Sequence, residues 1–208
     1  MYYYPNGNEE KRNVKNPRIQ TPIRLREITL MMIKFNESFP VHTETLTNVE
    51  DLNKILEEDI RTAGDSLGMR NPSAQCMMTR WDMHEQSKAF RMLGNAAIGL
   101  AQLLPLATRT HEDGKQNPVQ YKISTSWGLI YEKGQFTNSH THWPDTWSWT
   151  YCVSACEDCS PLVFSHANYR ISPEPSQMII FPGWLHHEVP IHTCNHERIM
   201  IAGNLVGF

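Results

Sequence analysis

Residues 136–142 read FTNSHTH, a predicted strand that ends in two histidines separated by one residue. Side chains at positions i and i+2 of a strand point to the same face, so His140 and His142 are expected side by side. Further short strands are predicted around this one, at 119–126, 128–131, 148–154, 161–166, 177–182 and 197–205. Gly, Pro, Asn or Asp separate most of them, and this spacing indicates an antiparallel sandwich or barrel.

The residues before this region predict a smaller, partly helical support. A polar arm is expected over 1–20 and a strand over 24–36, followed by two helices. Helices that precede an antiparallel sheet pack on the outer face of that sheet. The chain is therefore predicted to form one domain over 1–208, of α+β class and mainly β, with support from 21–118 and the sheets in 119–208.

The first helix is predicted from 47 to about 64, and the second from about 83 to 104. Asn48 is the expected N-cap of the first helix, and Pro105 marks the end of the second. The apolar stripe of the first helix consists of Leu52, Ile55, Leu56 and Ile60.

Composition excludes several classes of protein. A net charge of −3 over 208 residues does not indicate nucleic-acid binding. No run of about 18 apolar residues is present, so a membrane-spanning helix is not expected. Five cysteines without a secretory signal fit a reducing compartment, and a soluble cytosolic protein is predicted. Cys156 and Cys159 have metal or redox spacing, but the sequence has no second CxxC motif, and we interpret them as two thiols of a loop between strands.

A third histidine on a distant strand could complete a metal site with His140 and His142. His186 and His187 are adjacent, so an extended strand points them to opposite faces; we expect His187 inward and His186 outward. Neutral imidazoles suit Fe, Zn, Cu and Ni. The usual facial triad contains one carboxylate, and Asp145 is therefore kept as a reserve ligand. Without a metal, the same histidines would be polar residues of a half-exposed strand. Two more, His192 and His196, are expected at the surface.

Arg198 begins the last predicted strand, and Met200, Ala202 and Asn204 share its face. A guanidinium on an inward face can hold a carboxylate through its planar fork. The alternative is a structural salt bridge to Glu188 or Glu197. Together with the histidines, Arg198 indicates a metal-dependent enzyme with an acidic cosubstrate.

An ordered set of segments resembles the Fe(II)/2-oxoglutarate oxygenases of a prolyl-hydroxylase-like type, found in marine bacteria and tailed phages. The segments are 131–142, 148–151, 161–164, 180–189 and 197–198, followed by Asn204. The resemblance covers roughly residues 120–206. It implies a double-stranded β-helix, also called a jelly roll or cupin-like fold, with iron at one mouth.

The resemblance also implies roles for individual residues. Iron would be held by His140, His142 and His187, and 2-oxoglutarate by Arg198. Asn204 and Tyr151 would contact the cosubstrate. The chemistry would couple the decarboxylation of 2-oxoglutarate by O₂, giving succinate, to hydroxylation of a substrate C–H bond. This chain departs from the family around 149–152, where a large indole replaces glycine, and at His142, where a carboxylate is usual.

Three hypotheses follow from the sequence. The first is an Fe(II)- and 2-oxoglutarate-dependent oxygenase acting on an unidentified small molecule or peptide. The second is a non-catalytic jelly-roll module that binds a partner or builds a phage particle. The third is a three-histidine metallo-cupin enzyme that does not use 2-oxoglutarate. A homodimer is a possible assembly, and the host cytoplasm is the expected location of a phage-encoded chain.

Overall fold

The computed structural model describes residues 40–66, 73–104, 108–110, 114 and 116–208. The polar arm predicted over 1–20 and the strand predicted over 24–36 lie outside these ranges. Within them, no helix is long and apolar enough to cross a membrane.

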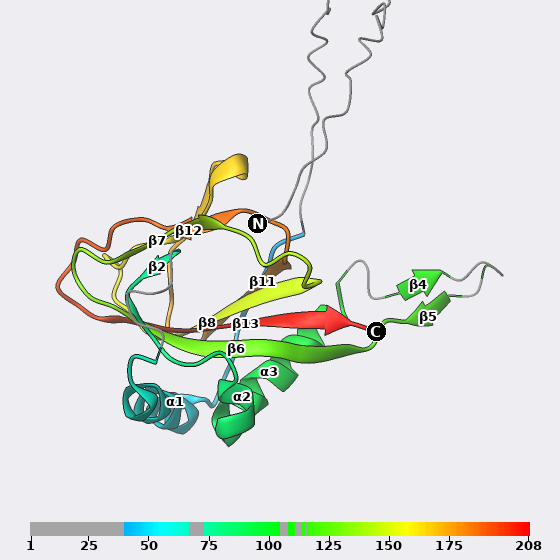
Figure 1. Cartoon of the computed structure of the whole chain (residues 1–208), viewed down its shortest axis with the longest axis horizontal. Coiled ribbons are helices and arrows are strands. Elements are labelled where there is room, and N and C mark those ends of the chain that lie inside the picture. The colour runs from blue at the N-terminus through cyan, green and yellow to red at the C-terminus, as the bar shows by residue number, and fades with distance from the viewer. Residues whose placement is uncertain (1–39, 67–72, 105–107, 111–113, 115) are drawn as a thin grey trace, which may run out of the picture. The chain divides into compact units, whose positions relative to one another are not determined.

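Two antiparallel sheets face each other (Figure 1). The larger contains, in order, β1 (His42–Thr45), β11 (Gln177–Pro182), β8 (Trp147–Ser154), β13 (Arg198–Gly207), β6 (Tyr121–Tyr131) and β3 (Met77–Met78). The smaller contains β10 (Tyr169–Ile171), β9 (Leu162–Phe164), β12 (His187–Val189), β7 (Phe136–His140) and β2 (Ala74–Gln75). A short 3₁₀ helix, η2 (Ser165–Ala167), joins β9 to β10.

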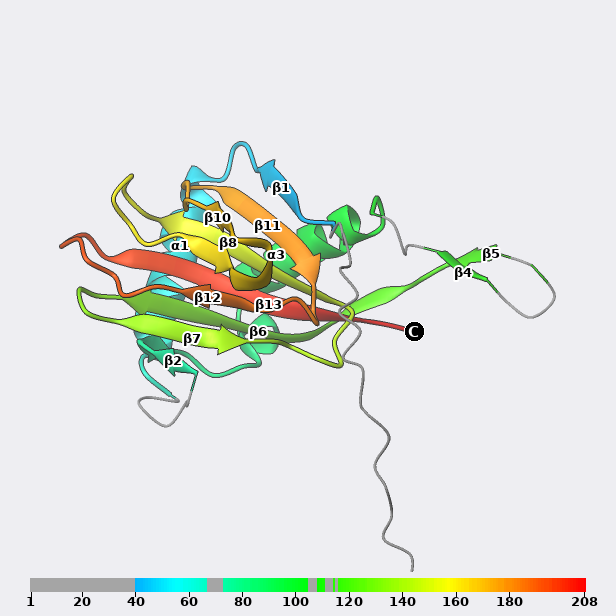
Figure 2. The same cartoon turned by 90° about the horizontal axis from the view of Figure 1, so that it is seen from above.

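From β6 onward, the chain crosses repeatedly between the two sheets. β6, β8, β11 and β13 belong to the larger sheet, whereas β7, β9, β10 and β12 belong to the smaller one (Figure 2). This topology is that of a jelly roll, as predicted. A separate two-stranded ribbon, β4 (Thr108–Thr110) and β5 (Gln116–Pro118), precedes β6.

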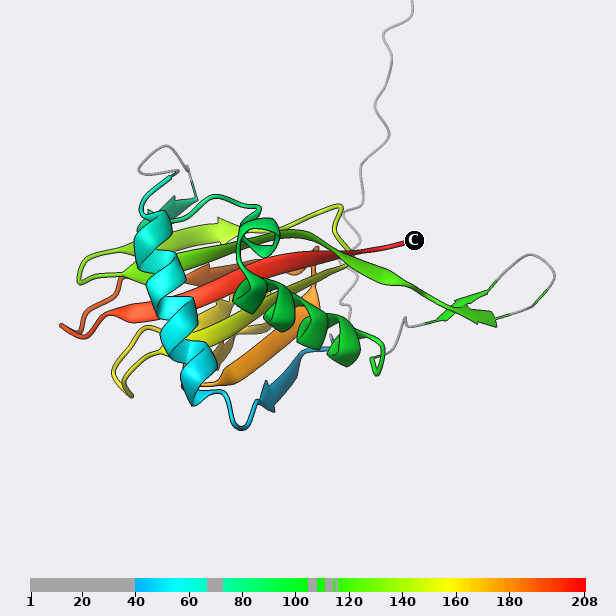
Figure 3. The ribbon, with the colours of Figure 1, turned by 90° about the horizontal axis from the view of Figure 1, so that it is seen from below.

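Three helices cover the outer face of the larger sheet (Figure 3). They are α1 (Glu50–Ala63), α2 (Met83–Gln86) and α3 (Lys88–Ala101). Leu56 and Ile60 of α1 and Phe90 of α3 are fully buried in a core that also contains the outward side chains of β8 and β13. The helices therefore fix which face of each central strand is available to the space between the sheets.

The boundaries of the elements differ from the sequence predictions in a few places. The second helix is interrupted at Ser87, whose extended backbone lets its hydroxyl accept a hydrogen bond from the Phe90 N–H at 3.2 Å. The first helix begins at Glu50 after Val49, so Asn48 is not its N-cap. Ile55 of the predicted apolar stripe is 51 % exposed. The two strands predicted over 119–131 form a single strand, β6.

Gly128 allows α1 to approach β6 closely. A Cβ atom at this position would lie 2.4 Å from Cγ1 of Ile60, a fully buried and β-branched side chain. A methyl group there would force the helix or the sheet to shift, because β-branched side chains have few alternative rotamers.

We expect Gly128→Ala to lower the free energy of unfolding by about 1–3 kcal/mol, the usual effect of overpacking. Urea denaturation would measure the change. In the double variant Gly128→Ala/Ile60→Ala, the free energy of unfolding should differ clearly from the sum of the two single changes. Gly99→Ala is the matched control, because Gly99 is at an exposed position of α3 and a Cβ there meets nothing within 4 Å. That control should be neutral or stabilising. An unchanged midpoint for Gly128→Ala would contradict the close packing.

Candidate metal and cosubstrate site

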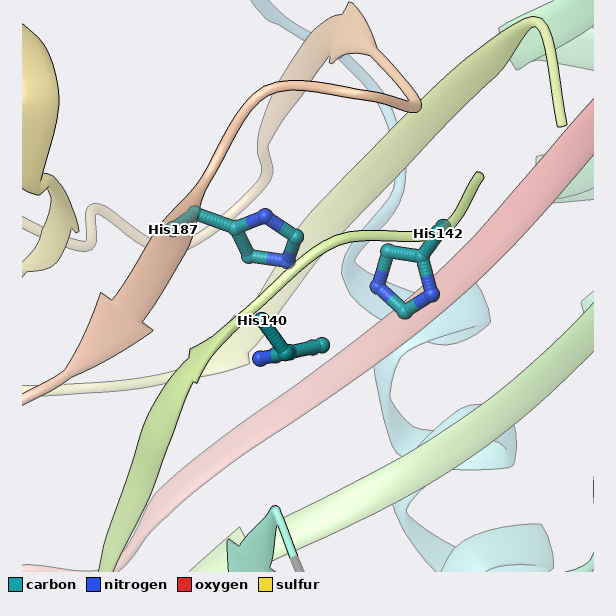
Figure 4. Close-up of side chains that lie close together, drawn as sticks. All are labelled: His140, His142 and His187. Atoms are coloured by element: carbon teal, nitrogen blue, oxygen red, sulfur yellow. The ribbon is translucent and has the colours of Figure 1, made fainter. Parts of the chain in front are cut away.

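Three histidines, two on neighbouring strands and one just after the end of β7, meet between the sheets (Figure 4). His187 on β12 lies opposite His140 on β7 in the antiparallel register, and their ring centroids are 4.4 Å apart. The His142 ring lies 4.9 Å from that of His140 and 5.1 Å from that of His187. One ligand atom from each of the three lies within 4.8 Å of the others. The group is therefore arranged to hold a metal ion.

His142 joins this group although β7 ends two residues earlier, at His140. Its backbone N–H donates to the carbonyl of Gly183 at 2.7 Å, which anchors the segment after β7 to the turn after β11. The Trp127 ring on the larger sheet lies 5.6 Å from the His142 ring. Both contacts come from distant segments, so the position of His142 depends on the fold more than on regular strand alternation.

Hydrogen bonds to main-chain carbonyls orient two of the rings. The Nδ1–H of His140 donates to the carbonyl of Asn138 at 2.8 Å, and that of His187 donates to the carbonyl of Leu185 at 2.9 Å. In this tautomer the Nε2 atom of each ring keeps its lone pair. Outer hydrogen bonds of this kind are the usual means of orienting histidine ligands.

The electrostatic environment keeps the three imidazoles neutral. Burial lowers the pKa of His142 to about 3, with a smaller contribution from His140. Burial also lowers the pKa of His140, and it lowers that of His187 well below the usual range. Only a neutral imidazole can donate a lone pair to a cation, so this environment favours metal binding at neutral pH.

Asp145, the reserve ligand, is not a member of the histidine group. Its carboxylate accepts a hydrogen bond from the Ser124 hydroxyl at 2.8 Å, and its backbone N–H donates to the His142 carbonyl at 2.9 Å. Asp145 lines the same cavity, but the chain turns after His142 and directs this carboxylate to β6. The geometry favours the three-histidine set.

The remaining histidines follow the predictions only in part. His187 and Val189 are buried, whereas the His186 ring lies against the exposed His166 with centroids 4.6 Å apart. This arrangement confirms the predicted alternation along β12. His196 is exposed, as expected, but His192 is fully buried and the prediction of a surface residue is wrong. Its Nε2–H donates to the carbonyl of His196 at 2.7 Å, which satisfies the buried ring.

Arg198 enters the space between the sheets as predicted. It is 2 % exposed, and its guanidinium carbon lies 4.9 Å from the centre of the Tyr131 ring. Met200, Ala202 and Asn204 line the same cavity, which confirms the predicted shared face. Glu197, one of the two partners considered for a structural salt bridge, instead pairs with Arg61 at 2.5 Å.

Three residues that line the cavity each contain a buried polar atom with no hydrogen-bond partner within the described part of the chain. These atoms are Nε of Arg198, the hydroxyl oxygen of Thr150 and Nε1 of Trp149. Unsatisfied buried groups of this kind are uncommon and costly. A bound ligand with acceptor atoms would supply the missing partner of the guanidinium.

A chain of contacts connects Arg198 to the histidines. The Tyr131 hydroxyl beneath the guanidinium lies 2.7 Å from the Thr137 hydroxyl. Thr137 is on β7, three residues before His140, and faces Val189 on β12 in the register. The guanidinium of Arg198, on β13, therefore lies near Thr137 of β7, three residues along that strand from His140.

The cavity that contains these groups has a volume of about 470 Å³, within the range of small-molecule sites. It is lined by the three histidines and Arg198, and by side chains of β6, β8 and β13. Trp81 and Trp143 also line it and are 52 % and 74 % exposed, which places them at its mouth. Trp147 and Trp149, by contrast, are fully buried.

Two of the residues expected to contact the cosubstrate have other partners. Tyr151 lies on the face of β8 that packs on the helices, where its hydroxyl donates to Oδ1 of Asn53 at 2.7 Å. It does not line the cavity, and the prediction for Tyr151 is wrong because alternation along β8 directs it away. Asn204 lines the cavity but bridges the sheet, accepting from Ser148 at 2.9 Å and donating to Thr125 at 3.0 Å.

No protein-family model matches the sequence, and no curated protein matches it significantly. Solved structures match the fold over most of the chain. A viral collagen prolyl hydroxylase from Paramecium bursaria Chlorella virus 1, in complex with 2-oxoglutarate, is 12 % identical with a TM-score of 0.62, covering 79 % of this chain and 94 % of its own.

This chain has the fold of these prolyl hydroxylases. A prolyl-4-hydroxylase from Pseudomonas putida is 16 % identical with a TM-score of 0.58, covering 81 % of this chain and 93 % of its own. HygX from Streptomyces hygroscopicus, with nickel and 2-oxoglutarate bound, is 10 % identical with a TM-score of 0.56, covering 81 % and 83 %. At these identities the likeness concerns the fold, and the function rests on the site residues.

We expect His187→Ala to abolish binding of Fe(II) or Ni(II) at this site, because it removes the most buried of the three imidazoles. His186→Ala is the matched control and should leave binding unchanged, since its ring points to the outer face. Anaerobic titration calorimetry would measure both affinities. Equal loss of affinity in the two variants would show that the register of β12 is wrong.

The low pKa of His142 predicts how the metal-free protein responds to acid. Between pH 6.5 and about 3 the folded ring stays neutral while the unfolded chain takes up a proton. The free energy of unfolding should therefore fall as the pH drops below 6.5, by up to about 1.4 kcal/mol per pH unit for this group. Urea denaturation of His142→Gln should show a shallower decline, and an identical slope in both proteins would contradict the prediction.

Proposed function

We propose that this protein is an Fe(II)- and 2-oxoglutarate-dependent oxygenase that hydroxylates a C–H bond of an unidentified substrate. The observation that carries the proposal is the presence of three neutral histidines and a buried, incompletely bonded arginine in one cavity of a jelly roll. When bound, Fe(II) would supply the coupling of 2-oxoglutarate decarboxylation to substrate oxidation.

The donor set fits this metal. Imidazole nitrogen is a suitable ligand for Fe(II), and three protein ligands on one side leave positions open for small molecules. His140 and His187 would each present Nε2, because their Nδ1–H groups are held by main-chain carbonyls. His142 would provide the third ligand in place of the more usual carboxylate.

Arg198 would bind the far carboxylate of 2-oxoglutarate. A planar guanidinium forms two parallel hydrogen bonds to a carboxylate, and such bonds are stronger when water is excluded. The Tyr131 ring holds the guanidinium on one side. The location of Arg198, deeper in the cavity than the histidines, suits a dicarboxylate with its keto-acid end at the metal.

The mouth of the cavity offers a surface for the substrate. The exposed indoles of Trp81 and Trp143 provide broad apolar faces, which can bind a ring or another flat apolar group. Several of the matching solved structures are named as prolyl hydroxylases, so peptides with prolyl residues are the first substrates to screen. HygX was also solved with hygromycin B bound, which makes hygromycin B a second compound to screen.

A second candidate is a three-histidine metal enzyme that uses no keto acid. It is favoured by one observation, the imidazole of His142 where the usual triad has a carboxylate. The two candidates differ in the role of Arg198. Under the oxygenase proposal this arginine binds a cosubstrate, and under the alternative it is a structural group only.

We expect Arg198→Met to weaken 2-oxoglutarate binding by at least about 100-fold, because it removes a buried, charge-assisted pair worth several kcal/mol. Calorimetry with the Ni(II)-loaded protein would measure the affinity. Succinate formation after O₂ is admitted to Fe(II)-loaded protein would measure uncoupled turnover, which should fall in parallel.

Arg170→Met, at an exposed position of β10, is the control for loss of a positive charge and should behave as the unchanged protein. Circular dichroism would verify that both variants fold. If the unchanged protein binds metal but not 2-oxoglutarate, or if Arg198→Met binds it equally well, the oxygenase proposal fails and the three-histidine alternative is favoured.

A further inference from the structure

Three cysteines that are distant in sequence lie together at one end of the sheets. Cys156 and Cys159 belong to the loop after β8, and Cys194 belongs to the loop between β12 and β13. These loops lie at the same end of the molecule's two sheets (Figures 1 and 2). The Sγ–Sγ distances are 3.5 Å between Cys156 and Cys159 and 3.7 Å from each of them to Cys194.

The three sulfur atoms form a nearly equilateral triangle of the size that a tetrahedral zinc ion requires. A Zn–S bond of about 2.3 Å in tetrahedral geometry corresponds to sulfur atoms about 3.8 Å apart. A disulfide would need two of the sulfurs at about 2.05 Å and would leave the third thiol unpaired. All three cysteines are free in the structure.

The main chain and a buried ring support these sulfurs. The backbone N–H of Cys156 points to Sγ of Cys159 at 3.3 Å, and the Cys159 N–H donates to the Cys156 carbonyl at 3.1 Å, which closes a tight turn. Nε2 of the fully buried His192 lies 3.3 Å from Sγ of Cys194. The Cys156 N–H directed at the Cys159 sulfur stabilises the thiolate form of that side chain, which is the form that binds metals.

We propose that Cys156, Cys159 and Cys194 bind a zinc ion at a site separate from the histidine site. Three thiolates select a thiophilic cation such as Zn²⁺ over the oxygen-seeking Mg²⁺ or Ca²⁺. Among the described residues, no fourth His, Cys, Asp or Glu ligand atom lies within 4.8 Å of all three sulfurs. The half-exposed positions of Cys156 and Cys194 leave the fourth ligand to solvent.

The site would be structural and would join two loops that flank the cavity. The loop with Cys194 leads directly into Arg198 at the start of β13. It already contacts the other loop through Ser160, whose hydroxyl donates to the Ile191 carbonyl at 3.2 Å. His192 also exchanges main-chain hydrogen bonds of 2.7 Å with Gln135 and Gly134 in the turn between β6 and β7. A bound zinc ion would hold the two cysteine-bearing loops together and, through His192, stabilise their contact with this turn.

Reconstitution of the full-length, metal-free and reduced protein with Co(II) tests the proposal. Co(II) bound to thiolates gives an intense near-ultraviolet charge-transfer absorption, which Co(II) bound to imidazoles lacks. We expect this absorption in the unchanged protein and in His187→Ala, and its loss in Cys194→Ser and Cys156→Ser. Cys76→Ala, which removes a buried thiol outside the cluster, is the control and should retain it.

Metal analysis after Zn(II) loading gives a second measurement. His187→Ala should retain about one zinc ion per chain, at the site that Cys194→Ser loses. Zinc should also raise the midpoint of thermal unfolding of His187→Ala, but not that of the double variant His187→Ala/Cys194→Ser. Absence of the thiolate absorption in the reduced protein, or its persistence in Cys194→Ser, would overturn the proposal. Three rather than five titratable thiols in metal-loaded, denatured protein would also overturn it, because two would be joined in a disulfide. None of these three results depends on the oxygenase proposal, since the histidine site is removed in the key variant.

Discussion

The antiparallel pairing of β12 with β7 is the interaction on which the candidate site depends. It places His187 opposite His140, while a hydrogen bond from His142 to Gly183 brings the third ring to the same point. A shift of one residue in this register would exchange His187 for His186, because neighbouring side chains of a strand point to opposite faces. The metal site is thus a direct consequence of strand register.

The same constraint operates in the larger sheet. β13 is paired on both sides, with β6 and with β8, so its alternation is fixed by two neighbours. Ile199 and Ile201 pack toward the helices, and this burial directs Arg198 and Met200 into the cavity. The helices contribute no lining side chain from α1 or α3, yet they decide which face of β13 meets the ligand. A buried guanidinium without a complete set of hydrogen-bond partners lowers the stability of the fold, and a bound ligand with acceptor atoms would remove that cost.

Much of this arrangement was predictable because it depends on local periodicity. Strand 177–182 was predicted to the residue, and the strands around 136–142, 148–154 and 197–205 were predicted to within two or three residues. Failures occurred where a contact with a distant segment overrides the local pattern. His192 lies in a polar stretch that predicts exposure, but it is fully buried, and its ring is hydrogen-bonded to the His196 carbonyl and to the Ser160 N–H. Tyr151 was assigned to the cavity from resemblance, whereas alternation along β8 assigns it to the helix side.

The sequence by itself determined which residues could act: the alternation around His140, the opposite directions of His186 and His187, and the shared face of Arg198, Met200, Ala202 and Asn204. These features follow from the two-residue period of a strand, which is a property of the local backbone. Only the tertiary structure decided that Asp145 turns to Ser124 and that Cys194 joins Cys156 and Cys159. Such contacts link segments 21 to 38 residues apart, and strand register and loop packing fix them in ways that no local pattern encodes.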